Sequence, residues 1–123
     1  MADMDTALKE IMEIDGTIGV ALVDHTSGMA LGTLGGGTDL DLTVAAAGDT
    51  DVVRAKLRAI EMLNLSEKIE DILITLDTQY HMIRPLTAPG GKGLFLYVAL
   101  RRDRSNLAMA RHQLRRIEAE LDV

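Results

Sequence analysis

Apolar positions recur at helical spacing in some stretches of the chain and at strand spacing in others. Residues 3–14 repeat apolar side chains every three or four positions, which predicts an amphipathic helix. Residues 18–23 are a short, continuous apolar run, typical of a strand covered on both faces. A polar turn over residues 24–28 leads to a second, weaker strand over residues 29–34. The two strands are predicted to form a hairpin.

The second half of the chain continues the pattern. It predicts a long helix over residues 39–63, strands over 69–77, 79–86 and 94–100, and a last helix that begins after Asp103 or Ser105 and ends at Leu121. Residues 94–100 are the most apolar stretch, so we expect this strand at the centre of the sheet. Gly48 lies inside the long helix and predicts a bend or a close contact there.

The order of these elements, α-β-β-α-β-β-β-α, predicts the fold class. Strands that are apolar on both faces must be covered on both sides. With only three helices, this favours a three-layer α/β/α sandwich around one five-stranded mixed or antiparallel sheet, an α/β (α+β) fold. No linker or repeat divides the sequence, so we expect a single domain over residues 1–123.

Composition narrows the function. The chain has no cysteine, which excludes disulfides, thiolate metal sites and a cysteine nucleophile. Three aromatic residues and a formal net charge of −6 argue against nucleic-acid binding. We find neither a signal peptide nor an apolar run long enough to span a membrane, so the expected location is the cytoplasm, without membrane insertion.

Charge is unevenly distributed along the chain. Residues 1–53 hold ten acidic residues and one lysine, a net charge of −9, whereas residues 54–123 hold nine acidic and twelve basic residues, a net charge of +3. This pattern fits either oppositely charged, self-complementary faces or a docking surface for a protein partner. Arg111 and Arg115 repel each other at helical spacing unless acidic residues from elsewhere neutralise them, and the acidic first helix is a candidate for this role.

The sequence contains no pattern typical of a catalytic, cofactor or metal site. Gly91 and Lys92 match the Gly-Lys pair of a phosphate-binding loop, but Leu86 stands where that loop has its first glycine, and Gly93 stands where it has Ser or Thr. His25, His81 and His112 lack metal-ligand spacing, and His81 fits a structural role inside a strand. Asp24, His25 and Ser27 are too close in sequence to align as a triad. We therefore do not expect an enzyme.

The element order resembles the roadblock family of dynein light chains and their bacterial relatives. The supporting residues are the run Gly16-Thr17-Ile18-Gly19-Val20-Ala21-Leu22-Val23-Asp24, followed by Gly28 at the return strand, which looks like the first hairpin of that family. The resemblance implies a non-enzymatic homodimer with strand order 2-1-5-4-3. It also implies that the third strand pairs with its twin while the long helices pack antiparallel. Bacterial members often act beside small Ras-like P-loop GTPases, as regulators or scaffolds in signalling.

This resemblance suggests which residues form interfaces. An edge as apolar as residues 72–74 would aggregate if left bare, and a two-fold dimer would bury it. The expected dimer interface comprises Ala47, Thr50, Arg54, Leu57, Ile72 and Ile74. The residues Arg54, Lys56 and Arg58 are either a partner surface or plain solvated surface. The alternative function is that of a small-ligand sensor of a related profilin-like fold, with residues 35–38 and 89–91 as lids.

Overall fold

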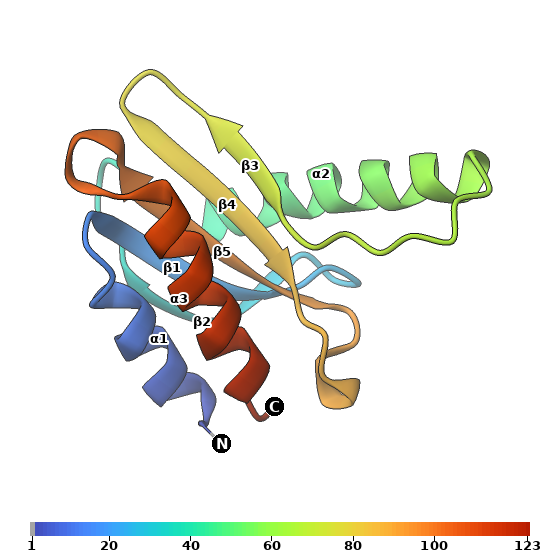
Figure 1. Ribbon diagram of the computed structural model, residues 1–123, viewed down its shortest axis with the longest axis horizontal. Helices are drawn as coiled ribbons and strands as arrows, with labels where there is room; N and C mark the ends of the chain where they lie inside the picture. The colour runs from blue at the N-terminus through green and yellow to red at the C-terminus, as the bar shows by residue number, and fades with distance from the viewer. Residues whose placement is uncertain (1) are drawn as a thin grey trace.

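The apolar segments assemble into one five-stranded antiparallel sheet with helices on both faces (Figure 1). This architecture comes from a computed structural model, which describes residues 2–123. The elements are α1 (Met4–Met12), β1 (Thr17–Asp24), β2 (Met29–Gly35), α2 (Leu42–Met62), β3 (Ile72–Thr75), β4 (Gln79–Pro85), β5 (Leu94–Arg101) and α3 (Leu107–Glu120), with 3-10 turns at Pro89–Gly91 and Arg102–Arg104. The strand order is β2-β1-β5-β4-β3, as the resemblance implied.

The central strand β5 divides two hydrophobic cores. Leu96, Val98 and Leu100 face α1 and α3, which lie beside each other over one side of the sheet. Phe95 and Tyr97 point to the opposite side and pack under α2. Every residue from 95 to 100 is buried, so the prediction that this strand is central is confirmed. Within residues 2–123, no helix combines the length and apolarity needed to cross a membrane.

Each of the three helices begins at a side chain that caps it. Asp3, Asp41 and Asn106 accept hydrogen bonds from backbone N–H groups two or three residues further on, at 2.9 to 3.2 Å. The last helix therefore starts later than the sequence predicted. Asp103 lies in a 3-10 turn and the hydroxyl of Ser105 donates to a backbone carbonyl, so neither caps α3.

Gly48 and Gly35 differ in whether the fold requires a glycine at their position. The predicted bend at Gly48 is wrong, because α2 continues through it as one helix, and a Cβ added there would meet no atom within 4 Å. Gly35 ends β2 with φ +76°, and an added Cβ would lie 2.6 Å from the carbonyl oxygen of Ile18. Position 35 therefore requires glycine on both conformational and steric grounds.

Candidate functional site

The sheet has a free edge at β3. This four-residue strand pairs with β4 on one side, and no strand within residues 2–123 pairs with the other. Ile72 and Ile74 lie opposite Ile83 and His81 in the register, and both remain only half-buried. Unpaired backbone groups beside half-covered isoleucines form a surface onto which another strand can add.

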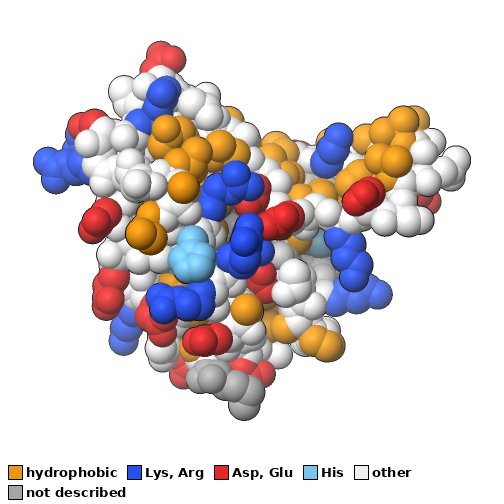
Figure 2. Space-filling model, viewed as in Figure 1, with side chains coloured by type: hydrophobic (Ala, Val, Ile, Leu, Met, Phe, Trp, Pro, Cys, Tyr) orange, Lys and Arg blue, Asp and Glu red, His pale blue; other side chains and the backbone are white. Residues whose placement is uncertain are grey.

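Next to this edge, α2 extends beyond the sheet (Figure 1). The buried residues of the helix all lie in its first twelve positions, ending at Val53. Beyond that point large apolar side chains face solvent, and Figure 2 shows them gathered at the end of the projection. The large apolar residues exposed beyond Val53 include Leu57, Met62, Leu63 and Leu65, which are 40%, 78%, 63% and 49% exposed. Apolar exposure of this kind on a projecting helix marks an interaction surface.

A groove of about 490 Å³ runs between α2 and the segment that returns from its end to β3. Its lining includes Val52, Lys56, Ile60, Leu65, Ile69 and Ile72. One wall is therefore α2 and the floor is the start of the free edge strand. We call this feature the edge groove; it joins the two exposed apolar features into one surface.

The interface and partner-surface residues expected from sequence lie in different places. Lys56 lines the edge groove, and Ile72 and Ile74 lie on β3. Thr50 is only 2% exposed, and its hydroxyl donates to the carbonyl of Ala46. Its place in a dimer interface stays a prediction.

Arg54 has a role that the sequence did not indicate. Its Nε and one terminal nitrogen each donate at 2.8 Å to backbone carbonyls of the β1–β2 turn, those of His25 and Thr26. The side chain is exposed but tied down, so it fastens this turn to α2. Ala47, Leu57 and Arg58 are exposed, and their place in an interface stays a prediction.

Arg111 and Arg115 are neutralised by residues other than those expected. Arg111 makes a bidentate contact with Asp71, with its shortest N–O distance 2.8 Å, and Arg115 pairs with Glu70. The prediction that the acidic first helix answers them is wrong. These pairs also draw residues 70–71 toward α3, so β3 begins at Ile72 and not at residue 69, and the two carboxylates do not point to opposite faces as strand neighbours would.

The same ion pairs continue inward. Arg84 is 5% exposed and contacts Asp71 at 3.6 Å and Glu118 at 3.0 Å. Glu118, 2% exposed, also accepts from the backbone N–H and the hydroxyl of Thr87. We call Asp71, Arg84, Arg111 and Glu118 the ion-pair network. It joins α3 to β4 and to the segment before β3, and so holds the edge strand in place.

A polar chain lies under α2, close to the free edge. The Tyr97 hydroxyl is 3.1 Å from His81 Nδ1, and His81 Nε2 is 2.7 Å from the side-chain oxygen of Gln79. Burial lowers the pKa of His81, which favours the neutral ring that this arrangement uses. The structural role predicted for His81 agrees with these contacts.

Asp49 lies beside this chain without a hydrogen-bond partner for its buried Oδ2. Burial raises the pKa of Asp49 to about 6. Burial, together with the nearby Asp49 charge, also raises the pKa of Tyr97. A carboxylate with a buried, unsatisfied oxygen is costly within an isolated chain. The sequence signal for it was only an acidic residue inside an apolar helix face.

A second hollow, of about 690 Å³, adjoins the edge groove, with which it shares Lys68 and Ile69. Val53, Leu57 and Leu94 contribute apolar lining, while His25, Lys68 and Lys92 add polar groups. The loop at Pro89 also lines it, as the ligand-sensor alternative expected, but residues 35–38 do not. This hollow is large enough for a small molecule.

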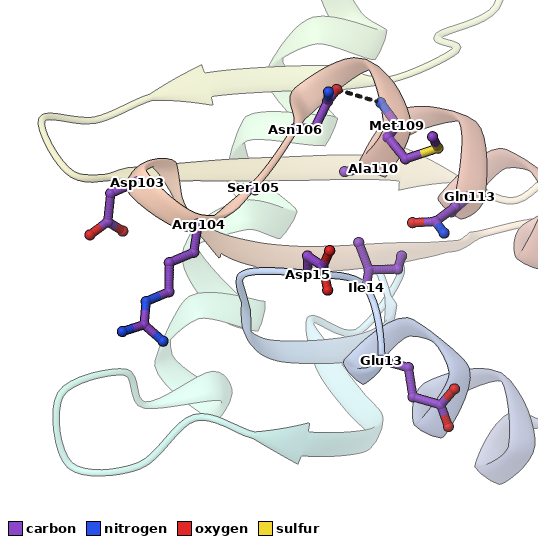
Figure 3. Close-up of a pocket in the computed structure, with 10 residues that line it drawn as sticks. All are labelled: Glu13, Ile14, Asp15, Asp103, Arg104, Ser105, Asn106, Met109, Ala110 and Gln113. Carbon is purple, nitrogen blue, oxygen red and sulfur yellow. Dashed lines mark hydrogen bonds between the residues drawn. The ribbon is translucent and has the colours of Figure 1, made fainter.

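A third hollow, of about 390 Å³, lies between the end of α1 and the start of α3 (Figure 3). The charged ends of Glu13, Asp103 and Arg104 point in different directions and do not converge on one point. The hydrogen bond drawn joins Asn106 to the backbone of Met109, which is the cap of α3. In the described part of the chain, no three His, Cys, Asp or Glu side chains are grouped to hold a metal ion.

Comparison with known proteins identifies the fold. No family model matches the sequence, and no curated protein matches it. Among solved structures, the Roadblock/LC7 domain from Streptomyces avermitilis is similar with a TM-score of 0.77 at 15% identity, over 95% of this chain and 92% of that one. Myxococcus xanthus MglB is similar with a TM-score of 0.74 at 15% identity, over 92% and 77%. MglC from the same organism gives 0.57 at 22% identity, over 95% and 98%.

The chain therefore has the roadblock fold, and the fold predicted from its hairpin motif and element order is confirmed. Two proteins of Myxococcus xanthus, MglB and MglC, are among the solved structures with a similar fold. At these identities the similarity concerns the fold.

Proposed function

We propose that this protein is a non-enzymatic homodimeric interaction module that regulates or positions a small Ras-like GTPase in a signalling complex. The observation that carries the proposal is the pairing of a free, half-covered edge strand with a long helix that extends past it. A second copy related by a two-fold axis covers both features at once, because isologous contacts bring the same patch together from each subunit.

The roadblock fold supports the second part of the proposal. Bacterial proteins of the family that this chain resembles often work beside small GTPases. The neighbours in structure include a gliding protein MglB from Thermus thermophilus and an MglB with a tetrameric arrangement. In the proposed assembly, the joined sheets and helices form a platform, and the exposed residues Arg54, Lys56 and Arg58 contribute to its partner surface.

The dimer is tested by placing charge on the free edge. Ile72→Lys combined with Ile74→Lys, hereafter the edge variant, is expected to convert a dimer of twice 13.3 kDa into a 13.3 kDa monomer in light scattering. Lysine on an edge strand opposes strand addition. The matched control is Leu31→Lys with Thr33→Lys, at exposed positions of β2 on the opposite edge. An edge variant that stays dimeric would overturn the proposed interface.

The GTPase partner is tested by affinity capture from the host lysate with a C-terminal tag, with GDP or a non-hydrolysable GTP analogue added. We expect a P-loop GTPase to be retained in one nucleotide state, identified by mass spectrometry. Purified GTPase and this protein should then form a complex whose affinity depends on the nucleotide. Recovery of other proteins without a GTPase would remove this part of the proposal and leave the dimeric module.

The hollow of about 690 Å³ favours a second candidate function, a small-ligand sensor. A ligand that binds only the folded state stabilises it, by an amount that grows with the logarithm of the ligand concentration relative to the dissociation constant. A thermal-shift screen of metabolites and nucleotides should then find a compound whose effect is lost in Leu57→Glu. A screen without any stabilising compound would count against the sensor.

A further inference from the structure

The hollow of about 690 Å³ combines an apolar lining with basic side chains from separate parts of the chain. Its size falls within the range of small-molecule sites. Val53 and Leu57 of α2 and Leu94 at the start of β5 give apolar lining. The lysines are Lys68, on the segment that returns from α2 to β3, and Lys92, on the loop before β5. We call this feature the basic hollow.

The two lysines have no ionic partner in their own chain. Within residues 2–123 every salt bridge is made by an arginine, and neither Lys68 nor Lys92 takes part in one. Among the described residues that line the hollow, Glu67 is the one acidic side chain. An anion in the hollow would therefore be attracted by two ammonium groups and repelled by one carboxylate.

This positive charge is local. The chain as a whole has a formal net charge of −6, so most of its surface repels anions. General attraction between the protein and an anion therefore cannot account for binding. Any anion that is retained must be held by a local arrangement of basic groups such as the one in the basic hollow.

His25 adds a ring that is held in place at the side of the hollow. Arg54 donates to the His25 carbonyl at 2.8 Å, and the His25 amide donates to the carbonyl of Gly93 at 2.9 Å. The imidazole stacks on Phe95, with ring centroids 6.4 Å apart and planes inclined by 20°. A lining that is already ordered loses little conformational freedom when a ligand binds, which favours binding.

We propose that the basic hollow binds a small amphipathic anion. Its apolar body contacts the side chains of α2 and β5, and its carboxylate, phosphate or sulfonate group is bound by Lys68 and Lys92. The inference rests on the second candidate function, the small-ligand sensor, and names the chemical class of its ligand. A neutral apolar molecule gains nothing from the ammonium groups, and inorganic phosphate gains nothing from the apolar lining. Affinity should therefore require both halves of the ligand.

The test compares two fluorescent dyes, 1-anilinonaphthalene-8-sulfonate and N-phenyl-1-naphthylamine, which has the same ring system without the sulfonate. At low ionic strength the wild-type protein should bind the sulfonate dye about fivefold more tightly or better. Octanoate should displace that dye, whereas octanol and inorganic phosphate at the same concentration should not.

Charge variants locate the anionic group. Lys68→Gln combined with Lys92→Gln should raise the dissociation constant of the sulfonate dye about fivefold and leave that of the neutral dye unchanged. Glu67→Gln should act in the opposite direction and tighten binding of the sulfonate dye. The matched control is Lys56→Gln combined with Arg58→Gln, which makes the same change in net charge at residues that do not line the hollow. It should alter either constant by less than about twofold.

The possible failures can be told apart. If neither dye binds, or if Leu57→Glu leaves both bound, the ligand site itself is overturned, and with it the sensor function. If both dyes bind equally to the wild type and to the double lysine variant, only the anionic class is overturned. A control variant that weakens the sulfonate dye as much as the double lysine variant does would overturn the role of Lys68 and Lys92. Circular dichroism establishes that each variant is folded, and the titration is repeated in the edge variant, so the result does not depend on the proposed dimer.

Discussion

Neutralising Glu118 should destabilise the protein strongly, because its charge compensates an arginine that is almost fully buried. Arg84 is 5% exposed and lies 3.0 Å from Glu118, whose other oxygen accepts two bonds from Thr87. Glu118→Gln keeps the shape and an acceptor for Thr87 but removes the negative charge, so the ion-pair network gains one uncompensated positive charge.

The size of the effect follows from the contacts that remain. Breaking a buried ion pair by removing one partner costs about 3–5 kcal/mol. Arg84 keeps a weaker contact with Asp71 at 3.6 Å, which places Glu118→Gln near the lower end, at about 3 kcal/mol. Glu118→Leu also removes the acceptor of the Thr87 backbone N–H; because Thr87 is exposed and water can replace that acceptor, this adds about 0.5–1.5 kcal/mol.

The assay is urea unfolding followed by circular dichroism, in the edge variant so that self-association does not contribute. The matched control is Glu120→Gln on the exposed face of α3, expected to change the free energy of unfolding by less than about 0.5 kcal/mol. Arg84→Met combined with Glu118→Leu removes both charges and should cost less than Glu118→Leu alone. A cost below about 1 kcal/mol for Glu118→Gln, or a double variant that costs the sum of its single changes, would show that Glu118 does not compensate the charge of Arg84.

Three further changes test other parts of the structure, with stability measured in the same way in the edge variant. The pKa of Asp49 is raised from 3.8 to about 6, so the folded chain holds a proton that the unfolded chain has lost, and the free energy of unfolding should fall as pH rises through this window. Asp49→Asn removes that pH dependence and, after allowance for the partial exposure of Asp49, should be more stable than the wild type at neutral pH by about 1–2 kcal/mol. If the difference in free energy of unfolding between the two proteins stayed constant from pH 4 to pH 7, burial would not be the cause of the raised pKa. Gly35→Ala should cost more than about 1 kcal/mol, because φ is +76° and the new Cβ would lie 2.6 Å from a carbonyl oxygen; an unchanged midpoint would refute this. Asp41→Ala should cost about 1 kcal/mol through loss of the α2 cap, whereas Asp39→Ala, outside the cap, should have little effect.

The local pattern of apolar and polar residues was enough to predict the helices and strands and their arrangement in layers. The apolar run in residues 94–100 required cover on both faces, and β5 is the central strand. The stripe that begins at Leu107 correctly predicted an amphipathic last helix, with Leu114 and Ile117 buried. These features depend on periodicity and on hydrogen bonds between near neighbours, which a sequence displays directly.

The exact ends of elements were harder to predict. The sequence placed the start of the edge strand at residue 69, but Arg111 and Arg115 hold Asp71 and Glu70 out of the sheet. These partners lie 40 and 45 positions apart, so no local pattern indicates that they meet. A strand end that depends on such pairs is decided only when α3 is already in place.

The residues of the interaction surface also differ in how far the sequence predicts their roles. Sequence alone determined that residues 72–74 are apolar enough to need a cover, and that the long helix carries Arg54, Lys56 and Arg58 at its middle. The packing of α2 on the sheet then directs Arg54 to a turn 28 and 29 positions earlier and Lys56 to the edge groove, which the sequence did not indicate. The physical reason is that periodicity determines which residues share a side of a helix, whereas the packing of that helix on the sheet determines what each side faces.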